Sequence, residues 1–152
     1  MSSLSLACTL KDKPDQVKEM NKKVFKTIQT YGPNPNHTDM FSRSPLHHAA
    51  KACNETAVEH LLKHGLDFTK DDGTVVSPQI KINVNAKTIG GETPLMKAAE
   101  AGSMDICVLL LRAGANPLLQ DNGGRTAARF AQLNHPDKEI HNMLNNYCAN
   151  FL

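Results

Sequence analysis

The feature that most constrains this chain is a sequence repeat with a period of 33 residues. The stretch that begins at Thr93, TPLMKAAEAGSMDICVLLLRAGAN, matches position by position the stretch that begins at Ser44, SPLHHAAKACNETAVEHLLKHGLD. Four equivalent markers, separated by 33, 49 and 33 residues, are Gly32, Gly65, Gly114 and Tyr147. A regular period with one interruption of 16 residues predicts a stack of similar supersecondary units.

The residue pattern inside each unit predicts two helices. The pair Ala49-Ala50, equivalent to Ala98-Ala99, is small enough to let helices approach closely, and the glycine after the second helix suits a left-handed cap. One unit cannot bury its apolar face alone, so neighbouring units must stack into an all-helical repeat solenoid. We therefore expect Leu110 to be buried between the third and fourth units.

The motifs TPLHxAA and LLxxGAN at this period resemble the ankyrin repeat, a β-turn followed by two antiparallel helices. Ser44-Pro45-Leu46-His47 matches the first motif closely. The resemblance covers nearly the whole chain and implies about four repeats in one domain, with a 16-residue insertion after the second. The expected boundaries are an N-terminal cap repeat at 1–37, a second repeat at 38–67, an inserted finger at 68–83, a third repeat at 84–120 and a C-terminal cap repeat at 121–152.

The two end units are expected to cap the stack. In the first, SLSLACTL predicts a short helix, and Pro14 suits the start of a longer helix that runs to about Tyr31. In the last, a helix is expected to begin with Pro136 and Asp137. Its exposed asparagines would give the end of the stack a polar surface, as a terminal repeat requires: Asn142, Asn145 and Asn146.

The insertion, FTKDDGTVVSPQIKIN, is predicted to form an elongated β-hairpin finger. Asp72-Gly73 is a strong turn signal between β-prone segments, and Pro78 disturbs the second arm. Its candidate contact residues are Lys70, Asp71, Asp72, Val75, Val76 and Ile80.

Charge and hydropathy narrow the class of partner. A net charge of +2, without a run of either sign, gives no electrostatic signal for nucleic acid or membrane, so we expect a protein partner. The apolar runs are too short to cross a bilayer, and the N-terminus lacks a leader pattern. We therefore predict a cytoplasmic chain, with a nuclear location as the alternative. A monomer is expected, with a dimer through the finger as the alternative.

The cysteines and histidines do not predict a catalytic or metal site. Four cysteines are scattered without short spacing, and each of Cys53 and Cys107 has a packing role in the repeat. His60 and His64 lie four apart on one helix without a third ligand, which is a weak metal signal. The ankyrin resemblance implies that His47, next to His48, bonds the backbone of the neighbouring turn. We expect no enzyme, no cofactor and no metal.

If the fold is right, function lies in the residues that packing does not fix. The resemblance places these at the turn tips and on the exposed side of the first helices, which line the concave face. Met40, Phe41 and Ile89 are apolar at such tips, and exposed apolar groups beside charges are typical of protein-binding surfaces. An alternative packs Phe41 against the long helix of the first unit. The candidate partner-binding residues are Met40, Phe41, Arg43, Lys51, Ile89, Glu92, Glu100, Arg125 and Asn134.

Three functional hypotheses follow from these patterns. The first is a non-catalytic protein-interaction module, an adaptor, scaffold or regulator that binds through its concave groove and finger. The second is a substrate of asparaginyl hydroxylation, because the resemblance places Asn36 and Asn85 at the loop position modified in many ankyrin proteins. The third, and least favoured, is a metalloprotein or enzyme that uses the histidines.

Overall fold

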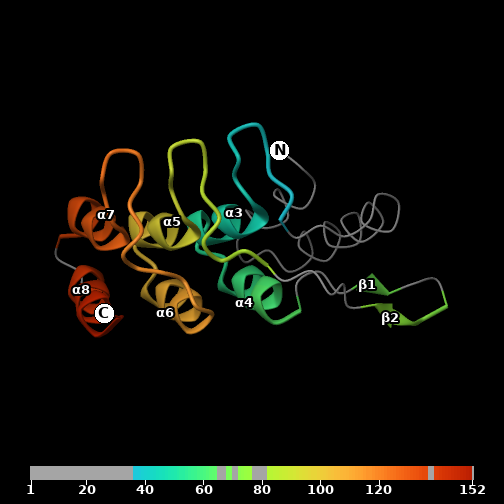
Figure 1. The fold of residues 1–152 in the computed structure, drawn as a ribbon. Helices are drawn as coiled ribbons and strands as arrows, with labels where there is room; N and C mark the ends of the chain where they lie inside the picture. The colour runs from blue at the N-terminus through green and yellow to red at the C-terminus, as the bar shows by residue number, and fades with distance from the viewer. Residues whose placement is uncertain (1–35, 65–67, 70–71, 77–81, 137–138, 152) are drawn as a thin grey trace.

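The computed structural model describes residues 36–64, 68–69, 72–76, 82–136 and 139–151 of the 152-residue chain. Among these residues the chain forms six helices and two short strands (Figure 1). The helices are α3 (Pro45–Lys51), α4 (Glu55–His64), α5 (Pro94–Ala101), α6 (Met104–Arg112), α7 (Ala127–Asn134) and α8 (Ile140–Phe151).

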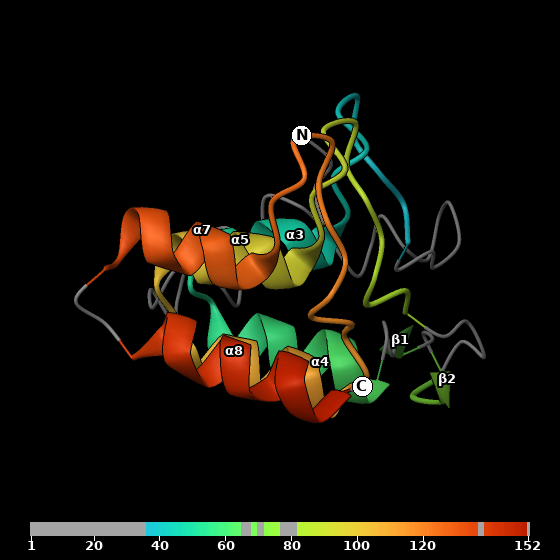
Figure 2. The same cartoon turned by 60° about the vertical axis from the view of Figure 1, so that its left-hand side comes forward.

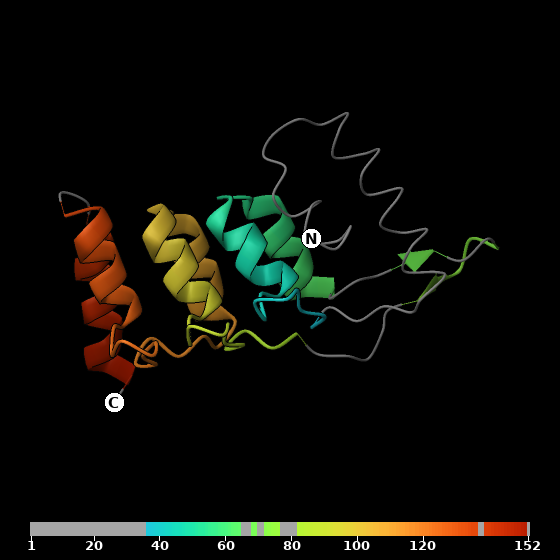
Figure 3. The same cartoon turned by 90° about the horizontal axis from the view of Figure 1, so that it is seen from above.

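The helices are arranged as three similar pairs. The first helices α3, α5 and α7 lie in one layer, and α4, α6 and α8 lie in a second layer beneath them (Figure 2). Seen from above, the pairs follow one another along one axis (Figure 3), and α5 packs between α3 and α7. We call the pairs α3–α4, α5–α6 and α7–α8 units two, three and four. This arrangement confirms the predicted α-helical repeat solenoid.

Each first helix begins at the same position of the repeat. Ser44, Thr93 and Thr126 are the N-caps, and their hydroxyl groups accept hydrogen bonds from backbone N–H groups in the first turn. In units two and three a proline follows at the first helical position, where its missing N–H leaves no hydrogen bond unmade. Local capping chemistry therefore fixes the register of the units.

The turn between the two helices of a unit requires a left-handed residue. Gly102 has φ +77° after α5, and the equivalent residue after α3, Cys53, has φ +53°. Cysteine adopts this conformation at a cost that glycine avoids, because its Cβ is crowded there. The prediction that Cys53 occupies the usual glycine position is confirmed.

The core is a strip that passes through all three units. Leu110 and its equivalent in unit two, Leu61, are buried, as are the small Ala49 and Ala98 that let the helices approach closely. Cys107 is also fully buried, and burial raises the pKa of its thiol to about 12, so it stays protonated. The packing role predicted for Cys107 is therefore confirmed. The cysteines of the described ranges are free thiols: Cys53, Cys107 and Cys148.

Polar side chains cover the exposed end of the stack at unit four. Arg129 and Gln132 occupy the positions that Met96 and Ala99 fill in unit three. Both are exposed, and Arg129 Nη1 donates to Gln132 Oε1 at 2.8 Å. The polar end was expected on the last helix, where the asparagines are exposed as well: Asn142, Asn145 and Asn146.

Two short strands are described within the predicted finger. Strand β1 (Phe68–Thr69) pairs antiparallel with β2 (Val75–Val76), with Phe68 opposite Val76. Gly73 has φ +85° between them, in line with the turn expected at Asp72-Gly73. In Figure 2 the strands lie beside the layer of second helices, away from the tops of the turns. The predicted contact residues Lys70, Asp71 and Ile80 lie outside the described residues.

Two other predictions need comment. The helices expected in the first unit, 1–37, lie outside the described residues except for its last two positions. The last helix begins at Ile140, so the expected start at Pro136 and Asp137 is wrong. His135, which precedes this proline, bonds a carbonyl oxygen of unit three, and the chain needs a longer turn from there to the second layer. Among the described residues no helix has the length and apolar character needed to cross a membrane.

Candidate functional site

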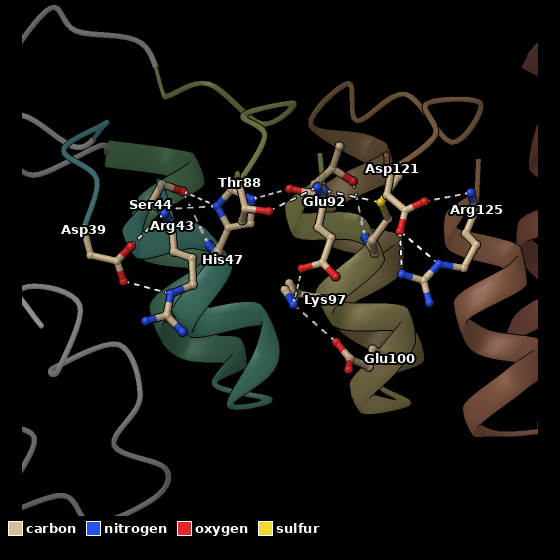
Figure 4. Close-up of polar contacts among 12 residues, drawn as sticks. Asp39, Arg43, Ser44, His47, Thr88, Glu92, Lys97, Glu100, Asp121 and Arg125 are labelled. Carbon is tan, nitrogen blue, oxygen red and sulfur yellow. Dashed lines mark hydrogen bonds and ion pairs between the residues drawn. The ribbon is translucent and has the colours of Figure 1, made fainter. Parts of the chain in front are cut away.

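Three turns project from the layer of first helices and form a continuous edge of the molecule (Figures 1 and 4). We call residues 39–43, 88–92 and 121–125 the turn tips. Ile89 N donates to Phe41 O at 3.1 Å, and Asn122 N donates to Gly90 O at 2.9 Å. These bonds join each tip to the next, so side chains on successive tips hold fixed relative positions.

A carboxylate closes the first tip. Asp39 Oδ1 accepts from Phe41 N at 3.0 Å and Arg43 N at 2.9 Å, and its Oδ2 accepts from Arg43 Nε at 2.8 Å. Burial alone would raise the pKa of Asp39. The hydrogen bonds from Arg43, Phe41 and His48 outweigh burial and hold that pKa well below its usual range.

The third tip repeats the carboxylate design of the first. Asp121 Oδ1 accepts from Gly123 N and Arg125 N at 3.0 and 2.8 Å, and its Oδ2 accepts from Arg125 Nε and Nη2 at 2.9 and 2.7 Å. Burial raises the pKa of Asp121, but the hydrogen bonds of Arg125 lower it further than burial raises it. Both carboxylates therefore stay ionised and hold their arginines in place.

The middle tip has different chemistry at the same positions. Thr88 replaces the aspartate, and its Oγ1 accepts from Glu92 N at 3.2 Å. Glu92 stands where the flanking tips carry arginine, and it forms an ion pair with Lys97 on α5. Lys97 Nζ also lies 3.5 Å from Glu100 Oε2, so one ammonium group is shared by two carboxylates. Figure 4 shows this group between Arg43 and Arg125.

Both arginines are also packed on aromatic rings. The guanidinium carbon of Arg43 lies 4.9 Å from the centre of the Phe41 ring, and that of Arg125 lies 4.6 Å from the centre of the Phe130 ring. Stacking of this kind fixes a guanidinium group without using its N–H donors. The predicted candidates Arg43, Glu92, Glu100 and Arg125 are thus held by neighbours that sequence analysis did not identify.

Three apolar side chains project from the first two tips. Met40 is 83% exposed, Phe41 52% and Ile89 64%. Met40 and Ile89 occupy the same repeat position, so their exposure recurs from one unit to the next. The contact described for Phe41 is the guanidinium group of Arg43, not the helix that the packing alternative required. The exposure expected at these three tip positions is confirmed.

The remaining candidates on the first helices lie at the ends distant from the tips. Lys51 is exposed at the last residue of α3. Asn134 is exposed at the last residue of α7, and its Nδ2 donates to Phe130 O at 2.9 Å. In the finger, Asp72 is exposed and accepts from Thr74 N at 2.9 Å, which is the bond of an aspartate in a turn.

The two asparagines proposed for hydroxylation join successive connecting loops. Asn36 Oδ1 accepts from Asn83 N at 2.8 Å, and Asn85 Oδ1 accepts from Asn116 N at 2.8 Å. They are equivalent positions that make equivalent bonds one repeat apart. Each side-chain carbonyl therefore has a structural role in stacking, whatever else it does.

Histidines join the units at both ends of the first helices. His47 Nδ1 accepts from Ser44 N at 3.1 Å, so its Nε2 carries the proton donated to Glu92 O at 2.8 Å. The contact expected for His47 is thus present. His135 Nε2 lies 2.8 Å from Glu100 O. Burial lowers the pKa of His47 to about 4, because a charged imidazole is poorly solvated there.

The second histidine of the motif belongs to the first tip. His48 Nε2 lies 3.1 Å from Asp39 Oδ2, and both side chains are nearly fully buried. Burial lowers the pKa of His48, although the bond to Asp39 acts in the opposite direction. Within the described ranges no three His, Cys, Asp or Glu side chains are placed to hold a metal ion.

Sequence analysis missed four residues that shape this surface. Asp39, Thr88 and Asp121 occupy one repeat position, and comparing them across units would have shown that the middle tip differs. Lys97 was not identified because its partners Glu92 and Glu100 come from the tip and the helix of the same unit, and only the fold brings all three together.

Comparisons with known proteins agree with this architecture. Residues 15–121 match the family model described as ankyrin repeats, in three copies. The chain is 31% identical over 107 residues to tyrosine-protein kinase HTK16 of Hydra vulgaris, covering 70% of this chain and 12% of that protein. It is 26% identical over 106 residues to putative ankyrin repeat protein L271 of Acanthamoeba polyphaga mimivirus, with the same coverage. It is 44% identical over 54 residues to dauer abnormal formation protein 25 of Caenorhabditis elegans, covering 35% of this chain and 14% of that protein. This chain matches only about an eighth of the length of these relatives.

Proposed function

Because the chain belongs to the ankyrin-repeat family, we propose that it is a non-catalytic module that binds a protein partner through its turn tips and the exposed side of its first helices. Ankyrin repeats are in general protein-interaction modules, and this proposal assigns that role to a particular face of this chain. The finer assignment, as adaptor, scaffold or regulator, depends on the partner.

The observation that carries the proposal is the exposure of apolar side chains on adjoining tips. Met40, Phe41 and Ile89 project from two turns that are hydrogen-bonded to each other, beside the charged Arg43 and Glu92. Folding gains nothing from leaving these side chains in water, whereas a partner that covers them would gain free energy from their burial. A rigid apolar centre with a charged rim has the composition of a protein-binding surface.

A binding selection tests the proposal. A display library of random linear peptides of roughly 12 residues is selected against the whole chain, and the dissociation constants of individual clones are measured by fluorescence polarisation. Phe41→Ala combined with Ile89→Ala should weaken binding of the selected clones by about tenfold or more, since each truncation removes apolar contact area. Met104→Ala is the matched control, because Met104 is an exposed apolar residue on a second helix.

Circular dichroism separates loss of binding from loss of fold. The double variant should keep the helical signal and the melting temperature of the parent, because both side chains are at least half exposed. If the selected clones bind the double variant and the parent equally, the partner surface lies elsewhere on the chain. Loss of helical signal in the double variant would instead revive the packing interpretation of Phe41.

The finger is a second proposed contact, independent of the tips. Its strands lie beside the second-helix layer, so a partner that contacts both surfaces must pass around the connecting loops (Figure 2). A two-stranded hairpin offers main-chain edges to a partner strand or to a second copy of itself. Deleting the finger should then weaken binding of some selected clones and leave the tip-directed clones unchanged.

Asparaginyl hydroxylation remains the alternative function. Asn36 and Asn85 lie at equivalent loop positions, and each uses its side-chain oxygen to bond the next loop. An enzyme that modifies these residues must therefore open a stacking contact first. Mass spectrometry of the protein purified from its native source would detect an added oxygen at either residue, and an unmodified mass at both would remove this alternative.

A further inference from the structure

The charge on the partner-binding face changes sign from one unit to the next. Unit two carries Arg43 at its tip and Lys51 at the far end of α3. The residues of unit three at the same two repeat positions are Glu92 and Glu100. Unit four returns to arginine at the tip, with Arg125. Two positions of the repeat thus give the same contrast between units two and three.

The two tip arginines are held in place but keep donors for a ligand. Arg43 uses Nε to bond Asp39 and lays its guanidinium face on Phe41. Arg125 uses Nε and Nη2 to bond Asp121. In the part of the chain that the structure describes, no hydrogen bond is made by the two Nη nitrogens of Arg43 or by Nη1 of Arg125. A guanidinium group fixed in this way is prepared to donate to a carboxylate.

Unit three presents a net negative charge between the two arginines. Lys97 is only 11% exposed and contacts both Glu92 and Glu100, so one buried ammonium group serves two carboxylates. Glu100 is 37% exposed, and its Oε2 makes no hydrogen bond in the structure. This face of unit three therefore lacks one positive charge, which a partner can supply.

We propose that the occupant of this face is an extended peptide with an acidic residue at position i, a lysine or arginine at i+3 and an acidic residue at i+6. This inference rests on the proposed function and specifies the chemistry of the partner. The acidic residues lie against Arg43 and Arg125, and the basic residue lies against Glu92 and Glu100. The pattern reads the same from either end, so it fits both directions of the peptide.

The spacing follows from the geometry of packed helices and of extended chains. Neighbouring packed helices are about 8–10 Å apart, and Arg43 and Arg125 are two units apart. A polyproline II helix rises about 3.1 Å per residue with three residues per turn, so every third side chain points the same way at intervals of about 9 Å. A β-strand would instead turn i and i+3 to opposite faces. The polyproline II conformation is therefore the one that places all three charges on the protein.

Synthetic peptides test the pattern directly. Fluorescein-labelled EPLKPLE is compared with EPLEPLK, which has the same composition with its charges in a different order, by fluorescence polarisation at low salt. EPLKPLE should bind the parent chain about five- to tenfold more tightly, since correctly placed charge pairs are each worth a fraction of a kcal/mol to a few kcal/mol. Equal binding of the two peptides overturns the inference.

Charge exchange provides the decisive arm of the experiment. Arg125→Glu should weaken EPLKPLE about fivefold or more and should prefer EPLKPLK, because the reversed residue now attracts a lysine. Glu100→Lys is the second variant, and it should prefer EPLEPLE. Weakening without this exchange of preference would mean that the variants act through the fold, and it overturns the inference.

The same measurements separate this inference from the function on which it rests. If library clones still depend on Phe41 and Ile89 but show no preference for the charge pattern, the partner surface stands and the pattern falls. If no clone depends on those two residues, both fall together.

Discussion

Units two and three have the same backbone but different side chains at their tips. Ser42 and Gly91 occupy the same turn position and are both left-handed, with φ +58° and +77°. The residues after the first helices, Cys53 and Gly102, agree in the same way, with φ +53° and +77°. The fold therefore imposes one conformation on four different residues, even where glycine is absent.

The two units differ in the contacts that reach the next unit. His47 of unit two donates to Glu92 O across the interface, whereas Met96, its equivalent in unit three, has no N–H donor to offer Arg125 O. Unit three is bonded instead at the other end of its first helix, where Glu100 O lies 2.8 Å from His135 Nε2. The comparison shows that stacking needs the apolar core and some polar contact, but not one particular residue.

The largest expected effect concerns the core that the two units share. Leu61→Ala and Leu110→Ala should each lower the free energy of unfolding by about 2–5 kcal/mol, because both side chains are buried and their removal leaves a cavity. Chemical denaturation measures both. Similar losses would show that the two units share one core, whereas a loss below about 0.5 kcal/mol at either position would contradict its assigned register.

Acid should distinguish unit two from unit three through His47. Its pKa is about 4 in the folded protein against 6.5 ordinarily, so the unfolded chain takes up this proton first as the pH falls. Stability should therefore decline between about pH 6.5 and pH 4, by about 3 kcal/mol for His47. Burial lowers the pKa of His48 as well, so it contributes in the same direction.

His47→Met copies the residue of unit three and isolates that contribution. At pH 7.5 the variant should lose no more than about 1.5 kcal/mol, the worth of one hydrogen bond. Its stability should then fall less steeply than that of the parent from pH 6.5 to 4. Denaturation curves at several pH values give the slope, and identical slopes for variant and parent would exclude His47 as the source.

Exchanging the left-handed turn residues should give unequal effects in the two units. Gly91→Ser should cost about 1–3 kcal/mol, because a Cβ there would lie 2.6 Å from Asn122 Oδ1 and 2.9 Å from Asn122 N. Ser42→Gly should gain at most about 1 kcal/mol by relieving the left-handed serine, and Ser42→Ala is the control without that relief. Thermal melts would detect both, and equal effects of opposite sign would mean that space around Gly91 does not matter.

The smallest effect is expected where the repeat is interrupted. Replacing residues 69–82 with two or three linking residues should leave the helices and their stacking intact, because the cost of closing a loop grows slowly with its length. The melting temperature should shift by less than about 10 °C, a change that would correspond to well over 1 kcal/mol. A larger fall would assign the segment to packing and remove the proposed contact through the finger.

The parts of this structure that could be predicted are those fixed by local chemistry. Ser44 and Thr93 mark helix starts because their hydroxyl groups bond backbone groups three residues away. His47 was placed through a motif that resembles ankyrin repeats. The exposure of Met40 and Ile89 followed from their position in the turns.

The parts that could not be predicted depend on residues that only the fold brings together. The bond from Ile89 N to Phe41 O joins tips separated by the whole insertion. Lys97 reaches two carboxylates that lie before and after it in the chain. Pro136 fits the first turn of a helix by local chemistry, yet α8 begins later because the preceding residue is bonded to unit three.

The most direct test of the central claim is a map of the bound surface by NMR. Amide chemical shifts of the uniformly labelled chain are recorded with and without a peptide from the display selection. We predict that the changes concentrate in residues 39–43 and 88–92 and along α3 and α5, while α4, α6 and α8 stay unchanged. Changes concentrated on the second helices, with the tips unaffected, would contradict the claim that this protein binds its partner through the turn tips.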